Sequence, residues 1–467
     1  MIMARTLALL SAALVLSACA ETQLPPPEPP ALPAHWRHAV KGEDPGRDWW
    51  RAFGSDELER LVVEAGATNL DLAGAVARVE QARAGARMAG AMLWPEIVAG
   101  VDVSRQGSLK GDRRVNATGY GVLLDASYEV DLWGGNRAGH DAALADLRAS
   151  AFERDAMELA VTAAVAVAWL EAVALRQRTD IAERNLQSAE RLLALVESRG
   201  RAGAAAPLEL AQQRGLVAAQ RRVLAALRQQ DEDARTELAV LLGRTGEIGI
   251  GLETLGPLAV PAIGAGLPSE LLVRRPDVAR AEALLAAADA DVAVARAAML
   301  PSLTLSGSVG TEGDRLRRAL DNPLYVLAAG LTAPIFNAGR LAAGRDLAVA
   351  RRQELVAGYR QAIIDAFADV EVALNAAVRL DAQAAFQAEE LTQAQRALAL
   401  AESRYGAGAE TLLTLLDAQR TLYAAQDAAV QIKLARLVAS VSLYKALGGG
   451  WRVDAAHEGW NLDPNVE

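Results

Sequence analysis

The sequence predicts a mostly α-helical, elongated protein that carries four short β-strands and consists of two similar halves. The first observation is a run of about sixty residues, 140–199, without a Gly or Pro, the two strongest helix breakers. At about 1.5 Å per residue such a helix is roughly 90 Å long, so it must pack against other long helices. The second observation is that the sequence pattern repeats after about 205 residues. The third is that each half holds two segments of about ten residues with strand-like character.

The composition excludes several classes of function. The 467 residues carry a net charge of -10 and no cluster of Lys and Arg, whereas a nucleic-acid partner requires a basic face. The chain has a single cysteine and four histidines, His35, His38, His140 and His457. These are few ligands for a metal site, so no metal site is predicted. No nucleophile has a partner that would activate it, so we predict no enzymatic activity.

The N-terminus has the features of an export signal. Arg5 provides the charged region, Leu7–Leu16 the apolar region, and the sequence that ends in Ala18-Cys19 resembles a bacterial lipobox. We predict that residues 1–18 are removed and that Cys19 carries a covalent lipid, with no other cofactor. The alternative is an ordinary secretory signal that contains a cysteine by chance. Residues 21–34 are a Pro-rich tether that spaces the lipid from the folded body.

In the first half, a helical region begins after Ser55, a plausible N-cap, and ends at Pro95. Two strand-like segments then flank a polar loop, and Gly134 and Gly135 turn the chain into the long helix. The sequence GRAGAAAP breaks that helix before a second one, which predicts a helical hairpin with a tight tip. The expected strands, loop and second helix are Ile97–Ser104, Ala117–Leu132, residues 106–116 and Leu208–Leu242.

The second half repeats this order after a connector rich in Gly and Pro. The tip sequence SRYGAGAETLLTL matches SRGRAGAAAPLEL, and the ALG that ends at Gly448 matches the LLG that ends at Gly243. The expected elements are a helix at Ser269–Leu300, strands at residues 302–311 and Leu324–Phe336, a loop at residues 312–322 and a helix from Arg345. The predicted divisions are 1–18 (signal), 19–41 (lipidated tether), 42–243 (first repeat), 244–268 (connector), 269–448 (second repeat) and 449–467 (C-terminal equatorial segment).

The four predicted strands have the length of tilted membrane strands but are too few to close a barrel. Backbone groups that face lipid must all be paired, and the smallest known membrane barrels have about eight strands. A trimer would supply twelve. The alternative is a small water-soluble sheet at one end of a helical body. Because the strand pair lies at the same place between helices in both halves, and polar loops join the strands, we favour the membrane barrel.

Four longer motifs follow one another along the two halves: YEVDLWGGNR (Tyr128–Arg137), LPSELLVRRPDVARAEALL (Leu267–Leu285), APIFNAGR (Ala333–Arg340) and YGAGAETLLTLLDAQRTLYAAQ (Tyr405–Gln426). Together with the lipobox they resemble the TolC-like outer-membrane factors, in the NodT/OprM-like lipoprotein branch that serves resistance-nodulation-division efflux pumps. The resemblance implies a homotrimer with a twelve-stranded β-barrel in the outer membrane, continued through the periplasm by a long α-helical barrel. It also implies an exit duct that works with a periplasmic membrane-fusion adaptor and an inner-membrane pump of the resistance-nodulation-division type.

The resemblance also implies where the protein resides and what it moves. Ala20, in place of an Asp, after the lipid-bearing Cys19 favours the outer membrane of a bacterial cell. The implied function is passive transport of small molecules such as drugs from the periplasm to the outside. The alternative function is a lipid-tethered coiled-coil spacer of the envelope without a pore.

Candidate functional residues gather at the hairpin tips. In the family, acidic residues just after the second tip form a ring that narrows the entrance. Asp417 matches the second of these acids, whereas Thr414 occupies the position of the first, so one ring is implied. Three carboxylates held close in a trimer would attract cations. The alternative is that Asp417 merely faces water on an exposed helix.

The family also joins its two tips by polar links, which we call the tip lock. Tyr405 matches the tyrosine of that lock and Glu209 its acidic partner from the first hairpin. Glu410 replaces a basic residue of the family pattern, which implies that the lock is either weaker here or uses Arg404 or Arg201 instead. The alternative for Tyr405 is packing on the helix surface. Trp133, at the end of a strand, is a candidate anchor at the membrane interface or a core residue.

Overall fold

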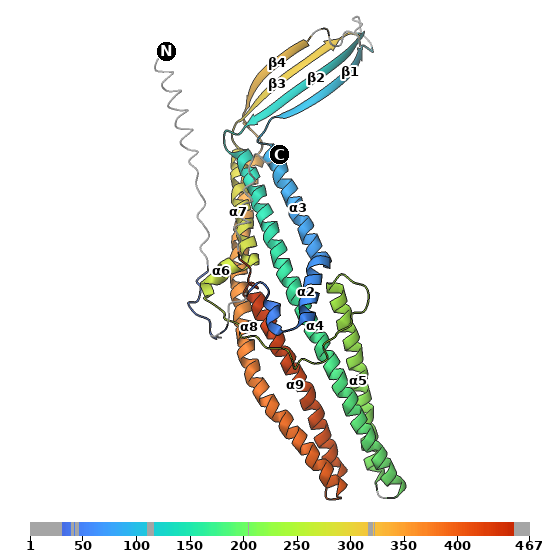
Figure 1. The fold of residues 1–467 in the computed structure, drawn as a ribbon. Helices are drawn as coiled ribbons and strands as arrows, with labels where there is room; N and C mark the ends of the chain where they lie inside the picture. Colours follow the sequence, from blue (N-terminus) through green and yellow to red (C-terminus); the bar gives the residue numbers. More distant parts are fainter. Residues whose placement is uncertain are drawn as a thin grey trace.

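The computed structural model describes residues 30–38, 42, 46–109, 116–203, 205–315, 321 and 323–452. An open four-stranded sheet lies at one end of a long helical body, and two helical hairpins form the other end (Figure 1). The predicted signal, Cys19, most of the tether and most of residues 449–467 lie outside the described residues.

The first helical region starts at Ser55, as predicted. Helix α2 (Asp56–Thr68) follows the short 3-10 helix η1 (Trp49–Phe53), and the Ser55 hydroxyl accepts a 3.2 Å hydrogen bond from the Leu58 N–H. The region is not continuous, because Asn69 is extended and caps a second helix, α3 (Leu70–Ala91). The Asn69 amide also donates to the Leu241 carbonyl at 2.9 Å.

Two hairpins of equal size confirm the internal duplication. Helices α4 (Gly135–Arg201) and α8 (Arg340–Gly406) both have 67 residues and begin about 205 residues apart. Helices α5 (Pro207–Leu241) and α9 (Leu412–Ala446) both have 35 residues and have the same offset. Helix α8 starts five residues before the predicted Arg345 because Gly339, with a φ of 81°, provides the left-handed turn into it.

Ion pairs set the register of the first hairpin. Each pair joins a Glu of α4 to an Arg of α5, and successive pairs are seven residues apart on both helices. This is the spacing of an antiparallel coiled coil. The pairs are Glu183 with Arg228 at 2.7 Å, Glu190 with Arg221 at 2.7 Å and Glu197 with Arg214 at 3.0 Å.

The helix predicted at Ser269–Leu300 is broken in the structure. It consists of the 3-10 helix η2 (Pro268–Glu270), α6 (Leu271–Arg274) and α7 (Pro276–Ala297). The break is at Arg275, which is extended because a residue before proline avoids the helical conformation. The buried Arg275 guanidinium donates to Asp277, to Asp369 at 3.0 Å and to the Ala446 carbonyl at 3.2 Å. These bonds tie α7 to α8 and α9.

The sheet is an antiparallel meander in the order β1-β2-β3-β4. Its strands are β1 (Glu96–Gly107), β2 (Asn116–Val130), β3 (Ser302–Gly313) and β4 (Pro323–Thr332). β4 ends before the predicted Phe336, since Pro334 has no N–H for a sheet bond. β2 pairs with β3, which joins the two halves, and the outer edges of β1 and β4 have no strand partner among the described residues.

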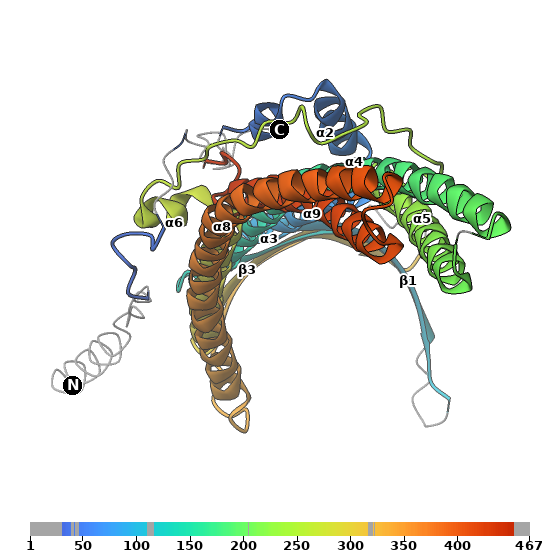
Figure 2. The same cartoon turned by 90° about the horizontal axis from the view of Figure 1, so that it is seen from below.

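The strand register separates two chemically different faces of the sheet. One face is almost entirely apolar and is exposed in the single chain; it includes Ile97, Val101, Val103, Val122, Leu124, Leu305, Val309, Tyr325, Leu327 and Leu331. The other face is mainly polar or small; it includes Asp102, Ser104, Gly119, Gly121, Asp125, Ser127, Glu129, Thr304, Ser306, Ser308 and Glu312. Sheet and helices follow one common arc that does not close on itself (Figure 2).

The main core lies at the middle of the long axis, which we call the equatorial level. Here α2, α4, α8, α9 and the connector 244–267 bury Phe53, Trp169, Leu242 and Ile363 completely. The Glu57 carboxylate accepts from the Trp169 indole at 3.2 Å and from the Gly251 N–H at 2.6 Å, which fixes α2 to the connector. Helix α4 contains one stretch of 18 residues that is apolar enough to cross a membrane by length and composition alone, and 56% of that stretch is buried in the structure.

Candidate functional site

The two hairpin tips have the same backbone design. Gly203 and Gly408 occupy equivalent positions after α4 and α8, with φ of 74° and 73°, a conformation that favours glycine. In the second tip the Thr411 hydroxyl caps α9 by accepting from the Thr414 N–H at 3.3 Å. The tips are therefore tight turns of fixed geometry, and the second hairpin ends with α9 on the concave side of α8 (Figure 2).

Tyr405 is part of a second core cluster, close to the tips. Its side chain is 6% exposed and belongs to one cluster with Leu412 and Leu416 of α9 and Val196 of α4. The Arg199 guanidinium carbon lies 5.2 Å from the centre of the Tyr405 ring, which is the geometry of a cation–π contact. Arg199 and Tyr405 therefore join the end of the first long helix to the end of the second.

The predicted link between Tyr405 and Glu209 is not formed within one chain. The Tyr405 hydroxyl is buried and has no hydrogen-bond partner among the described residues. Glu209 lies in the first turn of α5, and no hydrogen bond or ion pair of the described chain joins it to the second hairpin. Sequence reasoning missed Arg199, because a cation–π partner on another hairpin leaves no local motif.

Arg404 is bound within its own tip. It forms an ion pair with Glu410 at 3.4 Å and donates to the Ala409 carbonyl at 3.4 Å. The Thr411 N–H and the Thr414 hydroxyl donate to Glu410, and these bonds, with Arg404, hold the pKa of Glu410 below its usual value. The replacement of the family's basic residue by Glu410 thus gives Arg404 a local partner. Arg201, the other candidate, is exposed at the end of α4.

Asp417 lies on an exposed side of α9, in its second turn. Its neighbours Leu415 and Leu416 belong to the buried cluster around Tyr405, whereas Asp417 is exposed, so the carboxylate points away from that core. Thr414, at the position of the missing first acid, is also exposed. The arrangement is compatible with both interpretations of Asp417, the ring and the solvated helix surface.

A second connection between the hairpins was not predicted from the sequence. The Arg178 guanidinium of α4 donates to both carboxylate oxygens of Asp427 on α9, at 2.6 and 3.2 Å. One to two turns closer to the tips, the Tyr423 hydroxyl donates to the Asn185 carbonyl at 3.2 Å. Both pairs line a cavity of about 270 Å³ between α4, α5 and α9. The partners are about 240 residues apart in sequence, so no local pattern reveals them.

Trp133 lies where the sheet meets the helices. Its indole N–H donates to the Pro301 carbonyl at 2.7 Å, and its side chain is 39% exposed. The bond joins the end of β2 to the start of β3, beside a cavity of about 320 Å³. Trp133 therefore holds the junction of the two halves and also presents part of its ring outward.

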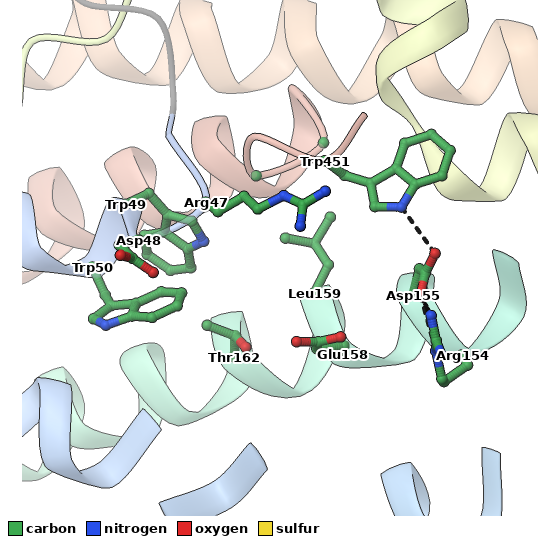
Figure 3. Close-up of a pocket in the computed structure, with 12 residues that line it drawn as sticks. Arg47, Asp48, Trp49, Trp50, Arg154, Asp155, Glu158, Leu159, Thr162 and Trp451 are labelled. Atoms are coloured by element: carbon green, nitrogen blue, oxygen red, sulfur yellow. Dashed lines mark hydrogen bonds and ion pairs between the residues drawn. The ribbon is translucent and has the colours of Figure 1, made fainter. Parts of the chain in front are cut away.

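A third cavity, of about 360 Å³, lies at the equatorial level, where residues 47–50 and 448–451 meet α4 (Figure 3). The Trp451 indole N–H donates to the buried Asp155 carboxylate at 2.9 Å, and Arg154 pairs with the same carboxylate. The Trp49 ring stacks on Tyr444 of α9, with 5.1 Å between the two ring centroids. The bond from Trp451 to Asp155 thus fixes the segment after α9 to α4, which is a structural role.

The sequence of this chain is similar to those of outer-membrane export proteins. The family described as outer membrane efflux protein matches residues 61–244 and 267–449, which correspond to the two halves of the fold. The pyoverdine export outer membrane protein OpmQ of Pseudomonas aeruginosa is 50% identical over 463 residues, which cover 96% of this chain and 98% of OpmQ. The cation efflux system protein CusC of Escherichia coli O6:H1 is 32% identical over 410 residues, which cover 86% and 88% of the two chains.

Solved channel structures have the same fold. The open state of the MtrE outer membrane channel of Neisseria gonorrhoeae aligns with a TM-score of 0.83 at 32% identity, and the alignment covers 92% of this chain and 98% of MtrE. The fold class predicted from the sequence is confirmed by this likeness, by the four antiparallel strands and by the two-part repeat. The chain belongs to the outer membrane efflux protein family and is an outer-membrane channel of an efflux or export system.

Proposed function

We propose that three copies of this chain form the exit duct of a tripartite exporter, which takes its cargo from a periplasmic adaptor and an inner-membrane pump. The observation that carries the proposal is the open sheet, whose edge strands β1 and β4 have no partner among the described residues. An unpaired edge in lipid leaves backbone groups unsatisfied, at several kcal/mol each. Pairing of β1 with β4 of the next copy satisfies both edges at once.

The two faces of the sheet support the same assembly. A barrel of three copies places the face with Val101, Leu124 and Leu327 against lipid and the face with Asp125 and Ser308 around water. The arc of the helices continues the curvature of the sheet, so three arcs would extend the barrel as a helical tunnel (Figure 2). A coiled-coil spacer has no need for a curved sheet with one apolar face.

The hairpin tips are the proposed periplasmic entrance of this tunnel. In the trimer, Asp417 would come from three copies and form the single acidic ring, while Arg199 and Tyr405 hold the two tips of each copy together. Transport through the duct is passive, with no catalytic step and no resident cofactor. A lipid on Cys19 would anchor each chain in the outer membrane.

The proposed cargo is a small molecule of the siderophore class, because the relative with 50% identity is named for pyoverdine export. The proposed pump is of the resistance-nodulation-division type, because the sequence motifs resemble those of the channels that serve such pumps. Deletion of the gene should trap such a cargo in the periplasm, and the wild-type gene should restore its release.

Planar bilayers test the duct directly. The purified protein should insert and conduct ions in steps of one size, and crosslinking in detergent should give a trimer. A stable single copy that conducts nothing would support the spacer instead.

A further inference from the structure

We infer that the protein carries a glycan-binding site on its outer wall at the equatorial level, and that the ligand is a strand of peptidoglycan. Peptidoglycan is the periplasmic polymer of N-acetylated amino sugars with short acidic peptides. The site is the cavity of about 360 Å³ between η1, α4 and the segment after α9 (Figure 3). Such a site is independent of the pump and the cargo that the channel serves.

The cavity lies on the outside of the helical body at a defined depth. Helix α2, which follows η1 directly, lies on the convex side of the arc (Figure 2). At about 1.5 Å per residue, Glu158 lies roughly 35 Å along α4 from Gly135, the end next to the sheet. A ligand at this level is therefore a component of the periplasm, and peptidoglycan is the extended polymer of that compartment.

Three of the eight tryptophans of the chain line this cavity. Trp49 is buried and stacks on Tyr444, and Trp451 donates to Asp155, so these two side chains have partners within the fold. Trp50 is half-buried and meets Trp49 at an angle of 76°, and no ring of the described chain stacks on it. The Trp50 indole therefore offers a flat apolar wall, against which the C–H face of a sugar ring can pack.

Hydrogen-bonding groups surround this wall. Arg47, Glu158 and Thr162 line the cavity together with Trp50, and the Arg47 guanidinium and the Glu158 carboxylate lie on either side of the Leu159 side chain (Figure 3). A carboxylate and a hydroxyl accept hydrogen bonds from sugar hydroxyls and from the N–H of an N-acetyl group. A guanidinium pairs with carboxylates, which the peptides of peptidoglycan carry. An apolar wall with a few polar groups around it is the usual design of a ligand site.

A glycine turn fixes one side of the cavity. The three glycines 448–450 have φ of 87°, 57° and 75°, a conformation that other residues rarely adopt. A Cβ at Gly449 would collide with the Leu159 side chain, so glycine lets this turn approach α4 closely. The bond from Trp451 to Asp155 holds the turn in place. The cavity is therefore formed before a ligand binds, which lowers the entropic cost of binding.

Co-sedimentation of the purified full-length protein with isolated peptidoglycan sacculi tests the site. The wild type should pellet with the sacculi, and oligomers of N-acetylglucosamine should release it. Trp50→Leu keeps an apolar side chain but removes the flat ring, and it should weaken binding about tenfold, a typical loss when a central aromatic contact is truncated. Arg47→Gln removes the charge and should weaken binding about threefold or more.

Matched control variants change the same residue types outside the cavity. Trp36→Leu alters another half-buried tryptophan, which packs on Phe367, and Arg60→Gln alters an exposed arginine of α2. Both controls should bind sacculi as the wild type does. A trimer on native gels and the conductance of the wild type show that each variant is folded.

Three results would overturn the inference: wild-type protein that stays in the supernatant, binding that N-acetylglucosamine oligomers do not release, and equal binding by Trp50→Leu and the wild type. A shortened chain that ends at Arg452 tests another occupant. If it binds sacculi and the wild type does not, residues 453–467 occupy the cavity, and the inference is again overturned. None of these results concerns ion conduction, so they leave the proposed duct untouched.

Discussion

The guanidinium carbon of Arg199 lies 5.2 Å from the ring centre of Tyr405, so the ends of α4 and α8 are joined by a cation and an aromatic ring. A cation–π contact at a partly exposed site contributes about 0.5–1 kcal/mol. Arg199→Ala should therefore loosen the tips and raise the fraction of time that the channel is open by roughly two- to fivefold. Single-channel recording measures this fraction.

Tyr405→Phe provides the contrast. The hydroxyl has no partner among the described residues, and the phenylalanine ring keeps both the packing and the cation–π contact. The open fraction should remain that of the wild type. A large gain of opening in Tyr405→Phe would mean that the hydroxyl bonds to a neighbouring chain, such as its Glu209.

Asp417→Ala tests the acidic ring. If three Asp417 carboxylates narrow the entrance, their removal should raise conductance and relieve block by divalent cations. Block is measured by titration of the current with Mg²⁺. The control is Glu232→Gln on an exposed position of α5. Unchanged block in Asp417→Ala would assign this residue to the solvated helix surface.

The Arg178–Asp427 pair should stabilise the contact between the hairpins. Asp427→Asn leaves a half-buried guanidinium with a weaker acceptor, and we expect a loss of about 1 kcal/mol in the free energy of unfolding, because the Asp427 side chain is 37% exposed. A urea titration of the solubilised protein measures the loss. In a double-mutant cycle, Arg178→Gln should then have little further effect; additive losses would show that the two residues act separately.

Glu171 gives stability a dependence on pH. Burial raises the pKa of Glu171 above its usual value, and the charge of Glu237 raises it further. The ionised form of Glu171 therefore lowers the free energy of unfolding at neutral pH. This destabilisation is lost as pH falls through the raised pKa toward the ordinary pKa of a glutamate. Glu171→Gln should raise the unfolding temperature at pH 7 and leave it unchanged near pH 4. An equal gain at both pH values would contradict this origin.

Cys19→Ala tests the anchor. If Cys19 carries the lipid, the measured mass of the wild-type protein should exceed the mass calculated for the polypeptide without its signal, and the difference should equal the mass of the lipid. The variant should lack this additional mass. Intact-mass spectrometry decides the question. A mass equal to the unmodified chain in the wild type would favour the ordinary secretory signal.

The helices and the repeat could be predicted because their signals are local. A run without Gly or Pro, the Ser55 cap and two tip sequences in the same register set the order of elements without knowledge of the tertiary structure. The breaks at Asn69 and Arg275 were missed because tertiary contacts fix them. Asn69 donates to a carbonyl 172 residues away, and Arg275 binds partners on α8 and α9.

The candidate site was predicted only in part, for the same reason. The tip motif identified Tyr405, Arg404 and Asp417, but not what each side chain contacts. Tyr405 contacts Arg199, and Asp427 contacts Arg178. In both pairs the partners are more than 200 residues apart in sequence, and only the packing of the two hairpins against each other brings them together. The strand register likewise decides which carboxylates share a face.

The pairing of β2 with β3 has a consequence for biogenesis. Tyr128 meets Leu305 across this ladder, so the sheet cannot be completed until the second half of the polypeptide has been made and its helices have brought β3 alongside. The lipid-facing surface therefore cannot form from the first half of the chain alone. A newly exported chain can cross the aqueous periplasm before it presents a finished apolar wall, and insertion into the membrane becomes coupled to the meeting of three nearly complete subunits.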